Sequence, residues 1–236
     1  MNNLNQAKLV MMKEFKSYFY TPIAYIVITV FLIFIGFFFF KDFFYFNQAQ
    51  MRSLFQTLPL MFSFVIPAVT MRLFSEERHS GTLEILLTLP VSSMDAVLGK
   101  FFAALAFCAV MLSPTLIYLG TVVFVGSPDP GPIIGGYFGS LFLAGAYSSI
   151  GILASSATKN QITAFIISWA LCFALWLIDK ITIFLPPSLG FIAYLGTDFH
   201  FQNISRGVID LKDIIYFISV AAISLMFSLR IIEERR

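Results

Sequence analysis

The sequence predicts an all-α membrane protein with six transmembrane helices. Hydrophobic residues make up 58% of the 236 residues, charged residues only 12%, and the mean hydropathy is +0.86. Soluble domains average about 25% charged residues, so this composition is typical of a polytopic membrane protein. Six apolar runs also reach the roughly 20 residues that a spanning helix needs, and the alternation of a β-barrel is absent. The predicted spans, within one membrane domain of residues 1–236, are 21–40, 54–74, 96–125, 133–154, 162–185 and 214–232.

An amphipathic pattern precedes the first span. Apolar side chains recur every three to four residues through positions 1–20, with three lysines among them, which predicts a helix in the membrane interface with its lysines toward anionic headgroups. An extended tail is the alternative. The apolar positions are Leu4, Ala7, Met11, Met12, Phe15 and Tyr18, and the lysines are Lys8, Lys13 and Lys16.

Local signals support several span boundaries. Thr21 followed by Pro22 fits a cap and a first helical position. The proline-rich turn at 128–132 separates the third span from the fourth. Asp210 and Asp213 are expected to cap the sixth span at the positive end of its dipole.

Lysine and arginine residues predict the orientation. Ten lie on the side that carries both termini and five on the other, so the positive-inside rule predicts cytoplasmic termini and a cytoplasmic loop at 75–95. The ten are Lys8, Lys13, Lys16, Arg72, Arg78, Lys100, Lys159, Arg230, Arg235 and Arg236. The five are Lys41, Arg52, Lys180, Arg206 and Lys212.

The segment between the fifth and sixth spans, residues 186–212, is long and apolar for an outer loop. It predicts two short helices, 188–195 and 197–205, divided by Gly196 and with Thr197 or Asp198 as a cap. They are too short to span and too apolar for water, so re-entrant or interfacial helices fit. A surface loop anchored by aromatic side chains is the alternative.

The loop after the second span is polar at its start and then apolar. Glu76, Glu77 and Arg78 precede a His-Ser-Gly breaker, after which residues 82–89 (TLEILLTL) predict a short leucine-faced helix that Ser80 or Thr82 can cap. Such a helix fits a groove on a partner protein. Alternatively, its leucines rest on the membrane surface.

This loop resembles the signature of the ABC-2 type permeases, the membrane subunits of one class of ATP-driven exporters. The similarity lies in the acidic pair, the run SGTLE at 80–84, the run LLTLPVS at 86–92, and Gly99-Lys100. The six-span plan and the N-terminal helix extend it over the chain. Residues 200–210 (HFQNISRGVID) are similar to gliding-motility (GldF-type) and nitrous-oxide-reductase maturation permeases.

The resemblance implies that two permeases pair in a bacterial inner membrane and that each docks on a cytoplasmic ATPase. The loop would be the coupling helix that enters a cleft of the ATPase, and the second cytoplasmic loop would add a smaller contact. ATP and magnesium would be bound by the ATPase, with no cofactor on this chain. The expected contact residues are Glu76, Glu77, Gly81, Thr82, Glu84, Leu86, Leu87, Ser156 and Lys159.

Three prolines inside predicted spans are candidate hinges. Pro59 and Pro67 lie in the second span and Pro114 in the third, and proline interrupts helical hydrogen bonding. These two spans flank the coupling loop. The bends they introduce are equally compatible with a static role.

Catalytic and metal sites are not expected. Both cysteines, Cys108 and Cys172, lie in apolar runs, and Gly99-Lys100 lacks the remaining residues of a phosphate-binding loop. Asp179 and Lys180 fit the outer membrane interface better than a buried substrate site. The net charge of +2, without a basic stripe, does not favour nucleic-acid binding.

Two functions therefore remain. The chain is either an export permease for a lipid-like, glycan or peptide substrate, or a mechanical transmitter that passes ATPase motion to a partner with a periplasmic domain. An aromatic-rich path with little charge suits a hydrophobic or amphiphilic substrate. The small outer loops mean that a transmitter needs such a partner.

Overall fold

The computed structural model describes residues 3–46, 50–82, 92–182 and 186–234, and the regular elements in these ranges are helices. They are α1 (Asn3–Tyr20), α2 (Pro22–Phe46), α3 (Arg52–Thr70), α4 (Arg72–His79), α6 (Ser93–Leu112), the 3₁₀ helix η1 (Ser113–Thr115), α7 (Leu116–Val125), α8 (Pro130–Ala157), α9 (Gln161–Thr182), the 3₁₀ helix η2 (Pro187–Leu195), α10 (Thr197–Ser205) and α11 (Leu211–Glu233).

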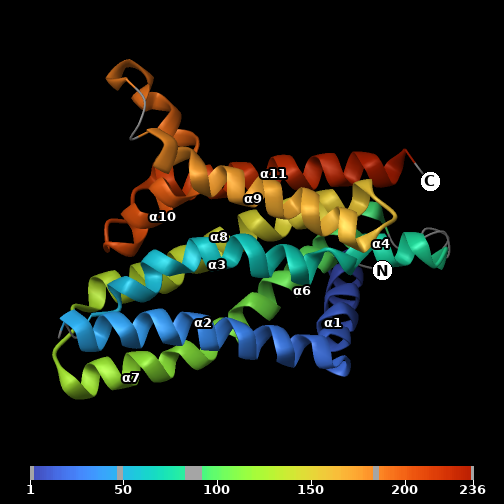
Figure 1. The fold of residues 1–236 in the computed structure, drawn as a ribbon. Coiled ribbons are helices and arrows are strands. Elements are labelled where there is room, and N and C mark those ends of the chain that lie inside the picture. Colours follow the sequence, from blue (N-terminus) through green and yellow to red (C-terminus); the bar gives the residue numbers. More distant parts are fainter. Residues whose placement is uncertain (1–2, 47–49, 83–91, 183–185, 235–236) are drawn as a thin grey trace.

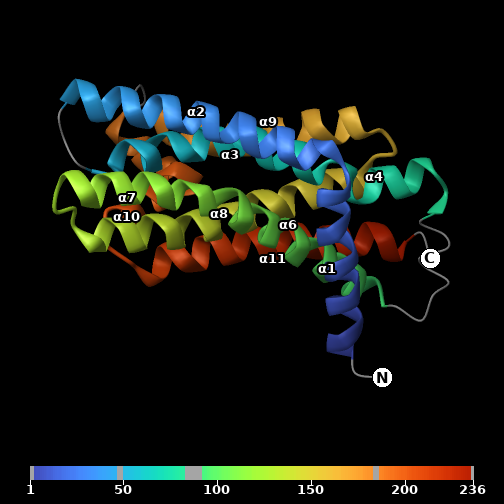
Figure 2. The same ribbon diagram turned by 90° about the horizontal axis from the view of Figure 1, so that it is seen from below.

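The predicted all-helical fold with six spans is confirmed. The helices long and apolar enough to cross a membrane are Pro22–Tyr45, Arg52–His79, Ser93–Val125, Pro130–Ala157, Gln161–Thr182 and Leu211–Glu233. They run side by side along the long direction of the molecule, and both termini lie at the same end (Figures 1 and 2). The second of these helices contains both α3 and α4, so it extends beyond the predicted end at residue 74.

Helix α8 is the centre of the bundle. It packs against α3, α6, α9, α10 and α11. In an apolar stretch of 18 residues within this helix, 78% is buried inside the protein. Its many small residues allow neighbouring backbones to approach closely. A Cβ atom at Gly139 would lie 3.0 Å from Cγ2 of Ile204, and one at Gly135 would overlap the Ile204 carbonyl oxygen, so these two glycines allow α10 to approach α8 closely.

Helix α1 crosses the bundle at a steep angle at the end that holds the termini (Figures 1 and 2). It packs mainly on α6, where a Cβ at Gly99 would lie 2.7 Å from Cβ of Val10. The predicted N-terminal helix is confirmed and the extended tail is wrong. Part of its apolar side, including the buried Val10 and Tyr18, contacts protein, whereas Leu9 and Met12 are exposed.

The predicted capping residues are used differently from expectation. Helix α2 begins at Pro22, as predicted, but the Thr21 hydroxyl donates back to the carbonyl of Tyr18. Asp210 is the N-cap residue of α11 but makes no side-chain cap bond, and its carboxylate pairs with Lys212 instead. The carboxylate of Asp213 turns away toward His200.

The two short helices of the 186–212 segment are confirmed as η2 and α10, separated by Gly196. The expected caps are wrong, because Gly196 occupies the N-cap position of α10 and no side chain caps it. Thr197 instead hydrogen-bonds the hydroxyl of Tyr147 at 2.8 Å, and Asp198 pairs with Lys180 at 2.5 Å. The first of these contacts is buried and the second is partly buried, and together they hold α10 against α8 and α9 at the end of the bundle opposite the termini (Figure 1).

Gly151 of α8 lies directly against Thr70, the last residue of α3. A Cβ at this position would overlap the Thr70 side chain, lying 2.7 Å from its Cβ. We expect Gly151→Ala to lower the free energy of unfolding by about 1–3 kcal/mol, the usual cost of overpacking. Thermal unfolding in a single detergent measures the effect.

Gly120→Ala is the matched control. It also adds one methyl group within a helix, but no atom lies within 4 Å of the new Cβ. Alanine is favoured over glycine in a helix by about 1 kcal/mol, so this variant should unfold at the same or a higher temperature. Equal melting temperatures for the two variants would contradict the packing argument.

Candidate functional site

The acidic segment after the second span forms the helix α4 and not a loop. Ser75, Glu76, Glu77 and Arg78 all lie within α4, which ends at His79. Gly81 follows with φ +73°, the left-handed conformation that commonly terminates helices. The Ser80 hydroxyl lies 2.8 Å from that of Thr82 and donates to the carbonyl of Glu76, so it closes α4. The prediction that Ser80 or Thr82 caps a helix that follows concerns residues outside the described ranges.

The first turn of α4 is capped by a residue of α8. The Ser155 hydroxyl accepts hydrogen bonds from the backbone N–H groups of Phe74 and Ser75, at 2.9 and 3.0 Å, and donates to the carbonyl of Met71 at 2.7 Å. The first N–H groups of a helix lack partners within it. Ser155 therefore supplies from another helix the cap that Met71, with no side-chain cap bond, does not.

The last turn of α4 is also attached to α8. The Arg78 guanidinium donates to the Ser156 carbonyl at 2.7 Å, one of the final carbonyls of α8 that have no partner in their own helix. The Ser156 side chain is buried and donates to the Leu153 carbonyl. Within this chain Ser156 is thus engaged by α4, and its predicted contact with a partner protein stays a prediction. Lys159, in the turn that follows, is exposed.

A buried lysine joins α4 to two further helices. Lys100 in α6 is only 1% exposed, and its Nζ donates to Glu77 Oε1 of α4 at 2.8 Å and to Glu14 Oε1 of α1 at 3.1 Å. It also donates to the Leu73 carbonyl at 2.6 Å and lies 4.8 Å from the centre of the Phe74 ring. All three protons of the ammonium group thus have acceptors.

This arrangement explains why a charged side chain can be enclosed at this position. Removing an ammonium group from water is costly unless opposite charge and hydrogen bonds compensate. Glu14 and Glu77 are themselves only 14% and 17% exposed, so the three charges depend on one another. Glu77 is consequently turned toward Lys100, which makes it an internal anchor more than the surface contact that the sequence predicted.

Helix α1 is attached to the start of α4 by a second set of contacts. The guanidinium carbon of Arg72 lies 5.1 Å from the centre of the Tyr18 ring, a cation–π geometry. Burial raises the pKa of the Tyr18 hydroxyl, so this group stays neutral beside Val69. Charge and packing thus place α1, α4 and α6 in one fixed arrangement.

The remaining predicted contact residues form an exposed surface around the end of α4. Glu76, Gly81 and Thr82 are exposed there, at the end of the bundle that holds the termini and Lys159 (Figure 1). Glu84, Leu86 and Leu87 lie outside the described residues. The next described element, α6, has Ser92 as its N-cap residue, and the Ser92 hydroxyl accepts from the Asp95 N–H at 3.0 Å.

The candidate hinge prolines lie at or near interruptions of the helices. Pro114 lies in η1, which separates α6 from α7. Pro59 and Pro67 are buried inside α3, and the carbonyl of Pro67 accepts from Met71, the residue between α3 and α4. The predicted interruption at Pro114 is confirmed, whereas movement at any of the three remains a prediction.

Sequence analysis missed a buried polar cluster at the opposite end. His200 Nδ1 lies 2.6 Å from Oδ1 of the fully buried Asp213, and Nε2 lies 2.8 Å from the Tyr194 carbonyl. The Tyr216 ring stacks on the imidazole at 4.0 Å. A histidine in a short helix, thirteen residues before an acid in the first turn of the next span, was the available signal. The cluster ties η2, α10 and α11 together.

The described residues do not contain a group of three or more potential metal ligands, and neither polar cluster places a nucleophile beside a base on an open surface. What the α4 arrangement can do is mechanical. Any displacement of α4 acts on α3 through the chain, on α8 through Ser155 and Arg78, and on α6 and α1 through Lys100.

Loss of the Lys100 amine should destabilise the protein strongly. In Lys100→Met the two carboxylates stay partly buried without a counter-charge, and breaking such a pair typically costs about 3–5 kcal/mol. We expect a clearly lower melting temperature in detergent, together with faster proteolysis within residues 72–82.

Neutralising the partner should reverse part of this loss. Glu77→Gln added to Lys100→Met removes one of the uncompensated charges, so the double variant should be more stable than Lys100→Met alone. Strictly additive losses would show that Lys100 and Glu77 do not interact in the folded protein.

The comparison with known families agrees with this architecture. Residues 9–229 match the model of a family described as "ABC-2 family transporter protein". No curated protein matches the sequence. The match covers nearly the whole chain, including every helix that forms the α4 attachment, and the chain therefore belongs to the ABC-2 family of transporter proteins.

Proposed function

We propose that this chain is the permease subunit of an ATP-driven exporter and that α4, with the residues that follow it, receives the movement of a separate cytoplasmic ATPase. The observation that carries the proposal is the attachment of α4 to α8, α6 and α1 by buried or partly buried polar contacts, in addition to its covalent connection to α3. A surface helix that only covered the membrane interface would not need a buried Lys100 or a cap from Ser155.

The exposed end of α4 is the proposed contact surface. Glu76, Gly81 and Thr82 are exposed there, and Lys159 is exposed in the turn between α8 and α9. Glu84, Leu86 and Leu87 are proposed to complete the contact. Glu77 and Ser156 are excluded from it, since they hold α4 to the bundle.

The route of force follows the covalent and polar contacts. A push on α4 is passed to α3 across Met71, and to α6 through the Lys100 charges. Pro67 and Pro114 lie on these two routes, where helical hydrogen bonding is already interrupted. We infer that α3 and α6 tilt together and that this opens a path at the interface with a second permease.

Orientation and partners follow the same proposal. Lysine and arginine residues favour the end with both termini, which we assign to the cytoplasmic side of a bacterial inner membrane. Similarity of residues 200–210 to gliding-motility permeases supports a place in that subfamily. A subunit of that kind would act as a mechanical transmitter only if a partner supplied a periplasmic domain.

Charge reversal at the contact surface tests the proposal. Glu76→Lys should reduce co-purification of the ATPase and ATP-dependent transport by tenfold or more. The reason is that two like charges brought together at an interface cost several kcal/mol. Glu84→Lys and Leu86→Lys should likewise leave insertion intact while uncoupling ATP hydrolysis from transport. Size-exclusion profiles of the permease check the fold.

Glu233→Lys is the matched control, since it makes the same charge change at an exposed position near the C-terminal end of α11. It should retain ATPase binding and transport. Equal loss in Glu76→Lys and Glu233→Lys would indicate a general charge effect, and full activity in Glu76→Lys, Glu84→Lys and Leu86→Lys would refute the assignment of α4. ATPase coupling without transport of any lipid, glycan or peptide would favour the transmitter.

A further inference from the structure

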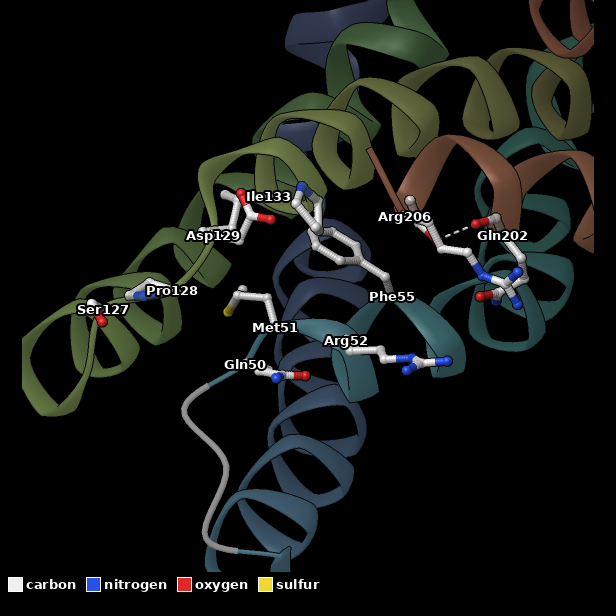
Figure 3. Close-up of a pocket in the computed structure, with 12 residues that line it drawn as sticks. Gln50, Met51, Arg52, Phe55, Ser127, Pro128, Asp129, Ile133, Gln202 and Arg206 are labelled. Carbon is white, nitrogen blue, oxygen red and sulfur yellow. Dashed lines mark hydrogen bonds between the residues drawn. The ribbon is translucent and has the colours of Figure 1, made fainter. Parts of the chain in front are cut away.

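A large cavity lies at the end of the bundle opposite α4. It has a volume of about 830 Å³ and lies between the start of α3, the turn from α7 to α8, and the end of α10 (Figure 3). One part of its lining is apolar and another part is polar. The apolar part includes Met51, Phe55 and Ile133, and the polar part includes Gln50, Arg52 and Arg206.

The two arginines are the distinctive feature of this cavity. Both are exposed, and within the described residues neither forms an ion pair. Of the other basic residues at this end, Lys180 and Lys212 are paired with carboxylates, and Lys41 does not line the cavity. Two guanidinium groups without partners therefore border a single cavity.

The cavity contains one opposing charge. The carboxylate of Asp129 accepts from the Gly131 N–H at 3.1 Å, as the N-cap of α8. In Figure 3 the Asp129 carboxylate and the two guanidinium groups lie on opposite sides of Phe55. Two positive groups and one negative group give the lining a net charge of +1, with the positive side separate from the acid.

The position of the cavity matches the depth of lipid headgroups. The apolar spans that contain α3 and α8 begin at Arg52 and Pro130, so the boundary between hydrocarbon and water passes beside the cavity. Arginine is disfavoured on the outer side of membrane proteins in short loops, so a pair of arginines here needs a compensating role. A guanidinium group binds phosphate oxygens with two parallel hydrogen bonds.

We propose that this cavity binds the phosphate headgroup of an anionic lipid. The phosphate lies between Arg52 and Arg206, and the start of an acyl chain or the glycerol backbone packs on the apolar part of the lining, where Ile133 is partly exposed. Binding at this site is independent of the proposed ATPase coupling, because it uses no residue of the α4 surface.

Native mass spectrometry of the detergent-purified full chain tests the proposal. The probes are phosphatidylglycerol and phosphatidylcholine with the same acyl chains. Phosphatidylglycerol should bind preferentially, and Arg52→Gln and Arg206→Gln should each weaken its binding about tenfold, the loss expected for one charge-assisted hydrogen bond. Because the two side chains are exposed and make no ion pair, melting temperatures should be unchanged.

Two further variants keep the experiment specific. Asp129→Asn removes the opposing charge but keeps a side chain that caps helices well, so it should strengthen phosphatidylglycerol binding. Lys41→Gln removes a positive charge from the same end outside the cavity and should have no effect. Any phosphatidylglycerol binding by the lysines of α1 is the same in every variant, so it does not affect the comparison.

The source of the phosphate is tested with soluble glycerol phosphate. It should compete only at far higher concentration than the lipid, since it cannot occupy the apolar wall. Competition equal to that of the lipid would overturn the assignment to a lipid. An unchanged phosphatidylglycerol preference in the Arg52→Gln/Arg206→Gln double variant, or equal binding of phosphatidylcholine, would overturn the site itself.

Discussion

The arrangement at the end of the bundle that holds both termini depends on one buried ammonium group. Lys100 sits where water is excluded, and its charge is compensated by carboxylates from two other helices. Electrostatic attraction is strong in such surroundings, and so is the penalty for separating the charges. The positions of α1, α4 and α6 are consequently linked. None of the three can move far alone without exposing a charge to an apolar surrounding.

A second set of contacts acts on the other side of α4. Ser155 and Arg78 join both ends of this short helix to the end of α8, the most buried span. Hydrogen bonds to unpaired helix termini are costly to leave unmade. The helix is therefore held from two directions, and the helical segments on either side are interrupted at Met71 and at η1.

The spans were predictable because length and apolar composition suffice to identify them. The two short outer helices were also predictable, since Gly196 divides a run too short to cross the membrane. The extent of α4 was missed because its polar residues resemble a loop, and their partners lie on distant segments: Glu77 bonds a lysine 23 residues away and Arg78 a carbonyl 78 residues away. The same reason explains why neither the burial of Ser156 nor the His200–Asp213 pair was foreseen. Chain periodicity carries no information about such long-range partners.

The cap that Ser155 provides has a consequence for biogenesis. During synthesis α4 emerges from the ribosome some 80 residues before the serine that completes its first turn. Until α8 has been inserted, the amide groups at the start of α4 lack this hydroxyl. The start of α4 is thus completed only when the fourth span has been inserted, and a nascent chain that stalls earlier would leave this helix without its cap.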